Sequence, residues 1–262
     1  MTTKRGKHDA GQAAIEAALT VPLLVFLALG TLQLFLLLQA RFLAEYAVFR
    51  AVRAGSLTHG DCKAMTHAAV LSVLPAIERT NDPTAVVEAF KKHANNRYQN
   101  LRKEIGASAA SAHVGQIIEL WRDVYFDQTK EIFLSTDSLP DPEDEKFDQP
   151  NHLMRLETRM IFWYRMKIPF ADWVLGRMFL AHYRLTEYDF ANPLSPVEGH
   201  AGWPDSGGLK FIGEPWPGGP LDTSMLAFAN QGHFLFPIRV TWSMRMMTPI
   251  KKKYFEDWGC TL

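Results

Sequence analysis

The sequence lacks the short motifs that mark the common enzyme classes. Its nine histidines form no H-x-x-x-H or H-E-x-x-H pattern, and none accompanies a cysteine cluster. There is also no G-x-S-x-G, no phosphate-binding glycine loop and no dinucleotide fingerprint. We therefore predict a non-enzymatic protein with no metal site and no cofactor.

Charge of one sign is not in excess either. The 28 Lys and Arg residues balance 28 Asp and Glu residues, and no segment has the concentrated positive charge that phosphate binding requires. The short run Lys251–Lys253 is followed by Glu256 and Asp257, and we expect it at a solvated terminus. No nucleic-acid partner is predicted.

What the sequence does contain is one uncharged run of membrane length. Ala17–Ala40 is 24 residues without a formal charge, and as a helix it covers ~36 Å, enough to cross a hydrocarbon core of ~30 Å. A cleaved secretory signal has an apolar core of only ~7–15 residues. Ala28–Gly30 could imitate a signal-peptidase site, but Leu32–Leu38 continues just as apolar beyond it. We expect a retained transmembrane helix.

Apolar residues continue at helical spacing beyond this run. They recur at intervals of three and four on one face: Phe42, Leu43, Tyr46, Ala47, Phe49 and Val52. This pattern predicts a single rod to about Ala54, with Gly55-Ser56 as its end. Pro22 lacks a backbone donor and is expected to kink or locally melt the rod.

A basic leader and one acidic residue stand before the run. Three of the residues 4–7 are basic, Gly11 follows them, and Glu16 immediately precedes the apolar residues. A cut after Gly11 would make Gln12 the first residue and Glu16 the fifth. This arrangement is typical of prepilins.

The segment Gly11–Leu23 resembles the start of TadE-like pseudopilins. These are minor subunits of the Tad (tight adherence, Flp) machinery, a branch of the type IV pilus and type II secretion superfamily. Ala51–Gly55, at the end of the long helix, is similar to that family as well. The close resemblance covers about residues 9–56, and a looser one covers the two strands described below.

The resemblance implies three parts: residues 1–11 as a basic prepilin leader, 12–55 as a transmembrane and stalk helix, and 56–262 as an extracytoplasmic head. It implies cleavage after Gly11 by a prepilin peptidase and assembly with other pilins at an inner-membrane platform. The positive-inside rule does not decide the orientation, because each flank of the run carries three Lys or Arg residues. The resemblance implies a single pass through the lipid of a bacterial inner membrane, with the N-terminus cytoplasmic and the head periplasmic, and a surface pilus as the destination after assembly.

The sequence allows two interpretations of Glu16. It is either an interfacial carboxylate favoured by the helix dipole, or a carboxylate buried among neighbouring subunits, where a cation must offset its desolvation. The new amine of Gln12 on an adjacent subunit would supply that cation, and the Gly11 context favours this second reading. A surface of small residues lets helices approach closely in lipid: Ala13, Ala14, Ala17 and Ala18.

The chain departs from the major pilins of this system in two ways. They commonly have an aromatic residue after the glutamate, where this chain has Ala17, and they are little more than the helix. A head of about 200 residues would crowd a thin fibre. A low-copy tip, priming or platform role is therefore favoured over a place in the shaft.

Cysteine is scarce, and Cys62 and Cys260 are the only two. Outside the cytoplasm, where disulfides persist, a bridge between them would close a loop of about 200 residues and contribute ~4–5 kcal/mol in the chain-entropy model. The alternatives are two separate thiols, or Cys62 paired with another subunit.

The remaining sequence predicts an α+β head of helices packed on an antiparallel sheet. Asp61 is expected to cap one helix, and Pro83 to begin another that continues through Tyr98 to Leu101. Two stretches alternate as strands with one face on a core, Leu156–Ile168 and Phe234–Met246. Further segments are expected as follows: Gly106–Gly115 a connection, Ile117–Phe126 a helix or a strand, Ser135–Asn151 a polar loop, and Pro169–Tyr183 an amphipathic helix.

A long segment rich in proline and glycine, Ala191–Asp222, shows little periodicity. It contains Trp203, Phe211 and Trp216, whose side chains are costly to leave in water. They either tuck onto the head or contact a partner.

Together these features favour a minor pseudopilin that assembles through its N-terminal helix in the biogenesis, priming or tip of a Tad-type pilus. One alternative is a single-pass envelope protein whose head binds a ligand or partner, in which case Gly11 is incidental. Another is a minor pseudopilin of type II secretion, which shares the mechanism.

Overall fold

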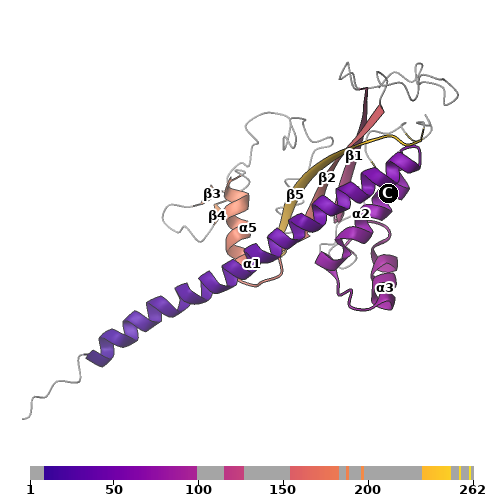
Figure 1. Cartoon of the computed structure of the whole chain (residues 1–262). Helices are drawn as coiled ribbons and strands as arrows, with labels where there is room; N and C mark the ends of the chain where they lie inside the picture. The colour runs from indigo at the N-terminus through magenta and orange to yellow at the C-terminus, as the bar shows by residue number, and fades with distance from the viewer. Residues whose placement is uncertain are drawn as a thin grey trace, which may run out of the picture.

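The structure is a computed structural model that describes residues 9–98, 115–126, 154–182, 187–188, 196–197 and 232–248, with Tyr254 and Cys260. A long helix projects from a head in which helices pack on a sheet (Figure 1), so the predicted α+β class is confirmed. The elements are α1 (Asp9–Leu57), α2 (Cys62–Ile77), α3 (Pro83–His93), β1 (Ile118–Phe126), β2 (Met154–Arg165), α5 (Ala171–His182), β3 (Glu187–Tyr188), β4 (Pro196–Val197) and β5 (Leu235–Arg245).

Helix α1 is one continuous rod of 49 residues, or ~74 Å at the usual rise. The expectation that Pro22 locally melts it is wrong, because the backbone is helical on both sides of Pro22 and through it. One missing hydrogen bond is tolerated where cooperative turns on either side hold the backbone. The rod ends at Leu57, one residue past the predicted end at Gly55-Ser56, and His59 and Gly60 then adopt positive φ.

The C-terminal half of α1 packs on the head through small residues. The buried positions lie three or four apart: Ala40, Ala44, Ala47, Val48, Ala51 and Val52. The predicted stripe of large residues is wrong at Phe42 and Tyr46, which are exposed. Small side chains occupy this face because α1 lies close to α2 and the sheet. The approach is so close that a Cβ at Gly55 would lie only 2.6 Å from the Met65 sulfur.

The two short helices begin as predicted. The Asp61 carboxylate accepts the Lys63 N–H at 3.1 Å and caps α2, and Pro83 occupies the first turn of α3. The predicted continuation of α3 through Tyr98 is wrong, because the helix ends at His93. Asn96 turns the chain with φ 55°, and its side-chain amide bonds both the N–H and the C=O of Ile118, at 3.0 and 2.6 Å.

The main sheet is antiparallel with the order β1-β2-β5, as expected for the two predicted strands. Residues 118–126, which the sequence left open, form the third strand and place Leu120 and Val240 on either side of Met160. The expected alternation holds at the start of β2 but not at its end, where Ile161 and Trp163 are buried on the second face.

Contacts from the preceding segment explain that second buried face. The Tyr98 hydroxyl donates to the Trp163 carbonyl at 2.7 Å, and the Trp163 indole N–H donates to the Glu119 carboxylate at 2.8 Å. Burial raises the pKa of the Tyr98 hydroxyl, since its phenolate would be desolvated.

One aromatic residue expected in the core is not there. Trp242 is 45% exposed, although its ring meets the edge of the Phe49 ring at 5.8 Å. It lies on β5, an edge strand of the sheet, where α1 covers only part of the face. The predicted loops Ser135–Asn151 and Ala191–Asp222 lie outside the described residues except for β4, as does Gly106–Gly115 except for Gly115.

Helix α5 packs at a glycine against Phe234, the residue before β5. A Cβ at Gly176 would lie 2.1 and 2.4 Å from two ring carbons of Phe234 and 2.9 Å from its Cβ, so the whole ring would have to move. We expect Gly176→Ala to lower the free energy of unfolding, because overpacking costs about 1–3 kcal/mol while helix propensity returns at most about 1 kcal/mol. Denaturant titration of the purified full chain measures this.

Gly30→Ala is the matched control, since a Cβ at Gly30 meets nothing within 4 Å. It should leave stability unchanged or slightly raised. Equal stability of the two variants would contradict the close packing of α5.

An ion pair joins the end of α2 to α3. The Lys92 ammonium lies 2.5 Å from the Glu78 carboxylate and His93 lies 3.2 Å from it, and together they hold the pKa of Glu78 below its usual range. Because the folded pKa is depressed, this stabilisation is present above the unfolded pKa of about 4.3 and is lost as the pH falls through the folded value.

We therefore expect Glu78→Gln to flatten the loss of stability on acidification below about pH 4.3. The change in the free energy of unfolding should stay below about 1 kcal/mol, because the Glu78 side chain is one-third exposed. Thermal unfolding as a function of pH measures it, and Lys92→Met should flatten the same slope. Wild-type slopes in both variants would exclude this role for the pair.

Candidate assembly surface

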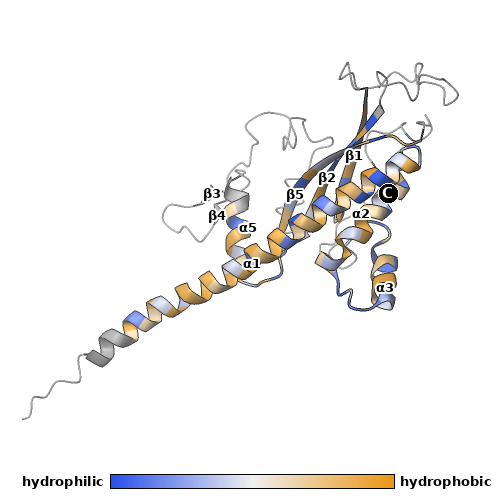
Figure 2. Cartoon of the chain, in the orientation of Figure 1, coloured by the Kyte–Doolittle hydropathy of each residue, from blue (hydrophilic) through white to orange (hydrophobic). Residues whose placement is uncertain are grey.

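The N-terminal part of α1 has no cover from the head. Every residue from Ala14 to Val25 is exposed, although most are apolar, and Figure 2 shows this part of the rod as predominantly hydrophobic. Within the described residues, α1 is the one helix long and apolar enough to cross a membrane. So much apolar surface on a single helix needs lipid or other helices around it.

Glu16 lies on this uncovered part of α1. Its side chain is exposed, and its backbone carbonyl accepts the Thr20 hydroxyl at 2.8 Å. The small residues Ala14, Ala17 and Ala18 are exposed beside it, as is Pro22. Gly11, Gln12 and Ala13 belong to the helical backbone of α1. The single chain therefore presents the glutamate and the small-residue surface together, away from the head.

The head docks on the later part of the apolar run through Gln33. This amide is 1% exposed, and its oxygen accepts the backbone N–H groups of Lys167 and Ile168 at 3.3 and 3.0 Å. The edge-to-face contact of Phe26 with Phe170 lies closer to the N-terminus of α1, with ring centroids 5.7 Å apart. The sequence analysis assigned no role to Gln33, although an amide between two leucines was the available signal for this contact.

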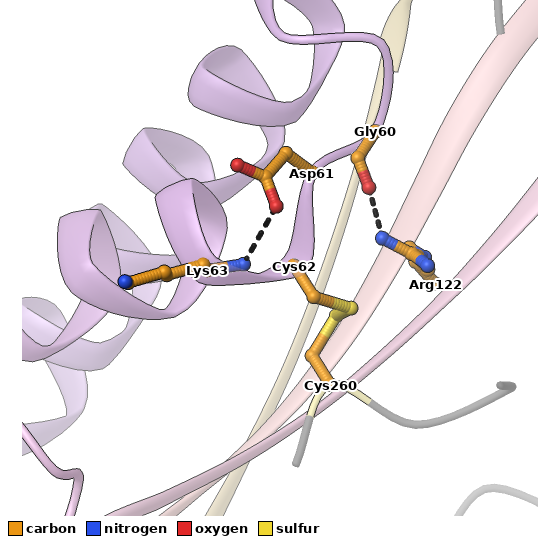
Figure 3. The surroundings of a disulfide bond; sticks show 6 residues. All are labelled: Gly60, Asp61, Cys62, Lys63, Arg122 and Cys260. Atoms are coloured by element: carbon orange, nitrogen blue, oxygen red, sulfur yellow. Dashed lines mark hydrogen bonds between the residues drawn. A yellow bond between two sulfur atoms is a disulfide. The ribbon is translucent and has the colours of Figure 1, made fainter. Parts of the chain in front are cut away.

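At the far end of α1 the head is closed by a disulfide. Cys62 and Cys260 are joined, with an S–S distance of 2.02 Å (Figure 3), which corresponds to the internal bridge among the sequence alternatives. The Cys260 N–H donates to the Leu120 carbonyl at 2.8 Å, and the Arg122 guanidinium donates to the Gly60 carbonyl. The bridge thus ties the C-terminal segment to the start of α2 and to β1.

The remaining candidates from the sequence are not placed. Trp203, Phe211 and Trp216 lie outside the described residues. Within the described part of the chain, no three His, Cys, Asp or Glu side chains gather as metal ligands would. The described site is an apolar helix surface with one carboxylate, which is suited to association with lipid or with other helices.

Comparison with known families supports the resemblance found in the sequence. A family model described as TadE-like protein matches residues 11–53, which begin at Gly11 and include all the proposed assembly residues of α1. The TadE-like identification is thus confirmed over the N-terminal segment. Comparison with curated proteins and with solved structures gives no match.

Proposed function

We propose, from the premise that residues 11–53 are those of a TadE-like protein, that this chain is a minor pseudopilin of a Tad-type pilus. The family associates the chain with pilus components and is a structural rather than an enzymatic type. The specific part that we assign is assembly with other pilins through α1, in the biogenesis, priming or tip of the fibre.

The observation that carries this proposal is the division of α1 into two halves. The half that begins at Ala40 is buried in the head through small residues, whereas Ala14–Val25 remains uncovered and includes Glu16. A helix of this kind can stay in lipid as an anchor and later exchange lipid for neighbouring helices, because both environments are apolar. Once lipid or other helices surround α1, the Glu16 carboxylate is stable only where a cation or water offsets its desolvation.

The proposed life cycle follows from this arrangement. Residues 1–11 form a leader on the cytoplasmic side, a prepilin peptidase cuts after Gly11, and the chain remains a single-pass protein of the inner membrane with its head in the periplasm. Residues 12–55 then serve as the membrane and stalk helix and 56–262 as the head. The disulfide between Cys62 and Cys260 is consistent with an oxidising location for the head.

The intact mass of the protein from membranes of its own host tests processing directly. We expect a mass that begins at Gln12, and we expect Gly11→Ala to retain the full leader, since the cut then has no glycine before it. Mass is preferred to N-terminal sequencing because Gln12 could cyclise and block it. A wild-type mass beginning at Met1 or Thr2 would refute prepilin processing and favour an anchored envelope protein.

A further inference from the structure

The turn before α5 lies against the membrane-length part of α1. Gln33 accepts the N–H groups of Lys167 and Ile168, and the Phe170 ring meets Phe26 at 5.7 Å. Figure 1 places α5 at the end of the head nearest the uncovered half of α1. The head therefore overlaps the apolar run along the axis of the rod instead of beginning beyond it.

Counting along α1 gives the depth of this turn. A hydrocarbon core takes about 20 helical residues, so a span counted from Gln12 ends near Thr31, and one counted from Ala17 ends about five residues later. Phe26 then lies roughly 8 to 15 Å inside the boundary on the head side. Since Phe170 contacts Phe26, it lies at acyl-chain depth by either count.

The side chains of this segment suit such a position. Phe170 and Met178 are 52% and 62% exposed. Phe170 has φ 71°, a conformation that a bulky residue rarely adopts, and this backbone directs its ring to α1. The Arg177 guanidinium lies 5.1 Å from the Trp173 ring centroid; such side chains sit at headgroup level with the charge toward water.

The carboxylate near the start of α5 is compatible with this depth. The Asp172 side chain accepts the Trp173 N–H at 2.6 Å, in the first turn of the helix, where the helix dipole favours negative charge. The segment is also held in place, because Gly176 is packed against Phe234, the residue before β5.

We propose that the turn 168–170 and α5 form a second membrane contact, inserted into the leaflet on the head side. Phe170 and Met178 enter the acyl chains, and Trp173 and Arg177 meet the headgroups. The head then rests on the bilayer before assembly. We call the turn 168–170 with α5 the membrane wedge, and extraction of α1 into a fibre must also withdraw it from the leaflet. The proposal rests on the membrane anchoring of α1 that we propose above.

Quenching by brominated acyl chains tests this contact. A fluorophore on Met178→Cys in the full chain, reconstituted in phospholipid vesicles, should lose about half its emission when the lipids are brominated, because quenching needs contact at the depth of an interfacial helix. Under non-reducing conditions the label reports one position, since the two native cysteines are joined to each other.

Two labels with similar exposure are the controls. Leu24→Cys on the uncovered part of α1 (63% exposed) should be quenched as strongly, and Val87→Cys on α3 (52% exposed) should not change. Adding Phe170→Asn to Met178→Cys should at least halve the quenching at position 178, while asparagine tolerates the positive φ and preserves the turn.

The outcomes separate the two proposals. Quenching at 24 but not at 178 overturns the membrane wedge and leaves the anchor standing. No quenching at 24 overturns the anchor and the wedge together. If the label at position 178 is unquenched in vesicles and becomes shielded from solvent only when partner pilins are added, the membrane contact of α5 is also overturned. That result would make α5 a contact surface for protein.

Discussion

Replacing Glu16 with alanine should leave the chain in the membrane and abolish its co-purification with partner pilins. Glu16 is exposed on the part of α1 that the head does not cover. In an assembled bundle the same carboxylate would be desolvated, and the amine of Gln12 on a neighbour would be its cation. Removing one partner of a buried pair costs about 3–5 kcal/mol, which is a loss of affinity of roughly two to four powers of ten.

The experiment compares membrane fractionation with pull-down from detergent extracts of the native host. Glu16→Gln keeps the shape but not the charge and should fail like Glu16→Ala, whereas Glu16→Asp should retain part of the binding. Thr20→Ala is the matched control, because the Thr20 hydroxyl donates within its own helix, to the Glu16 carbonyl. Normal pull-down by Glu16→Gln would show that the charge has no part in assembly.

The second large effect is expected from the disulfide. Changing Cys62 and Cys260 together to serine should lower the free energy of unfolding of the head by about 5 kcal/mol in the chain-entropy model, because the bridge spans 198 residues of sequence. Denaturant titration of the purified chain measures the loss. Reduction of the wild-type protein should produce the same shift, and reduction of the double variant should produce none.

Asp61→Ala is the local control for that variant. It removes the cap of α2 next to Cys62, which costs only about 1 kcal/mol, and leaves the cross-link in place. A double variant no less stable than Asp61→Ala would mean that the bridge constrains the unfolded chain very little. Equal alkylation of both cysteines with and without reduction would mean that the bridge is absent from the native protein.

The places where sequence reasoning failed share a physical cause. Phe42 and Tyr46 belong to the predicted apolar stripe of the stalk, but both are exposed. Mostly alanines occupy the buried face, because α1 lies too close to α2 and the sheet for larger side chains. In the same way, helical spacing through Tyr98 could not reveal that the Asn96 amide pairs with Ile118, 22 residues away. Periodicity describes which residues share a face; it does not say which face another element will cover.

The sequence by itself determined the features that are local in the chain. These features are the uncharged run of α1, the motif around Gly11 and Glu16, the helix starts at Asp61 and Pro83, and the two predicted strands. They depend on neighbouring residues only, and the family match and the α+β fold agree with them. Length, charge and spacing are sufficient for such features, because backbone geometry converts them directly into helices and strands.

Only the tertiary structure decided what long-range packing controls. It turned 118–126 into a strand by pairing it with β2, joined Cys62 to Cys260, and placed Lys167 and Phe170 beside the apolar run through Gln33 and Phe26. These contacts connect residues from 28 apart, at Phe126 and Met154, to 198 apart at the disulfide. Nothing in the local sequence ranks one distant partner above another, since their stability depends on the shape of the whole packed head.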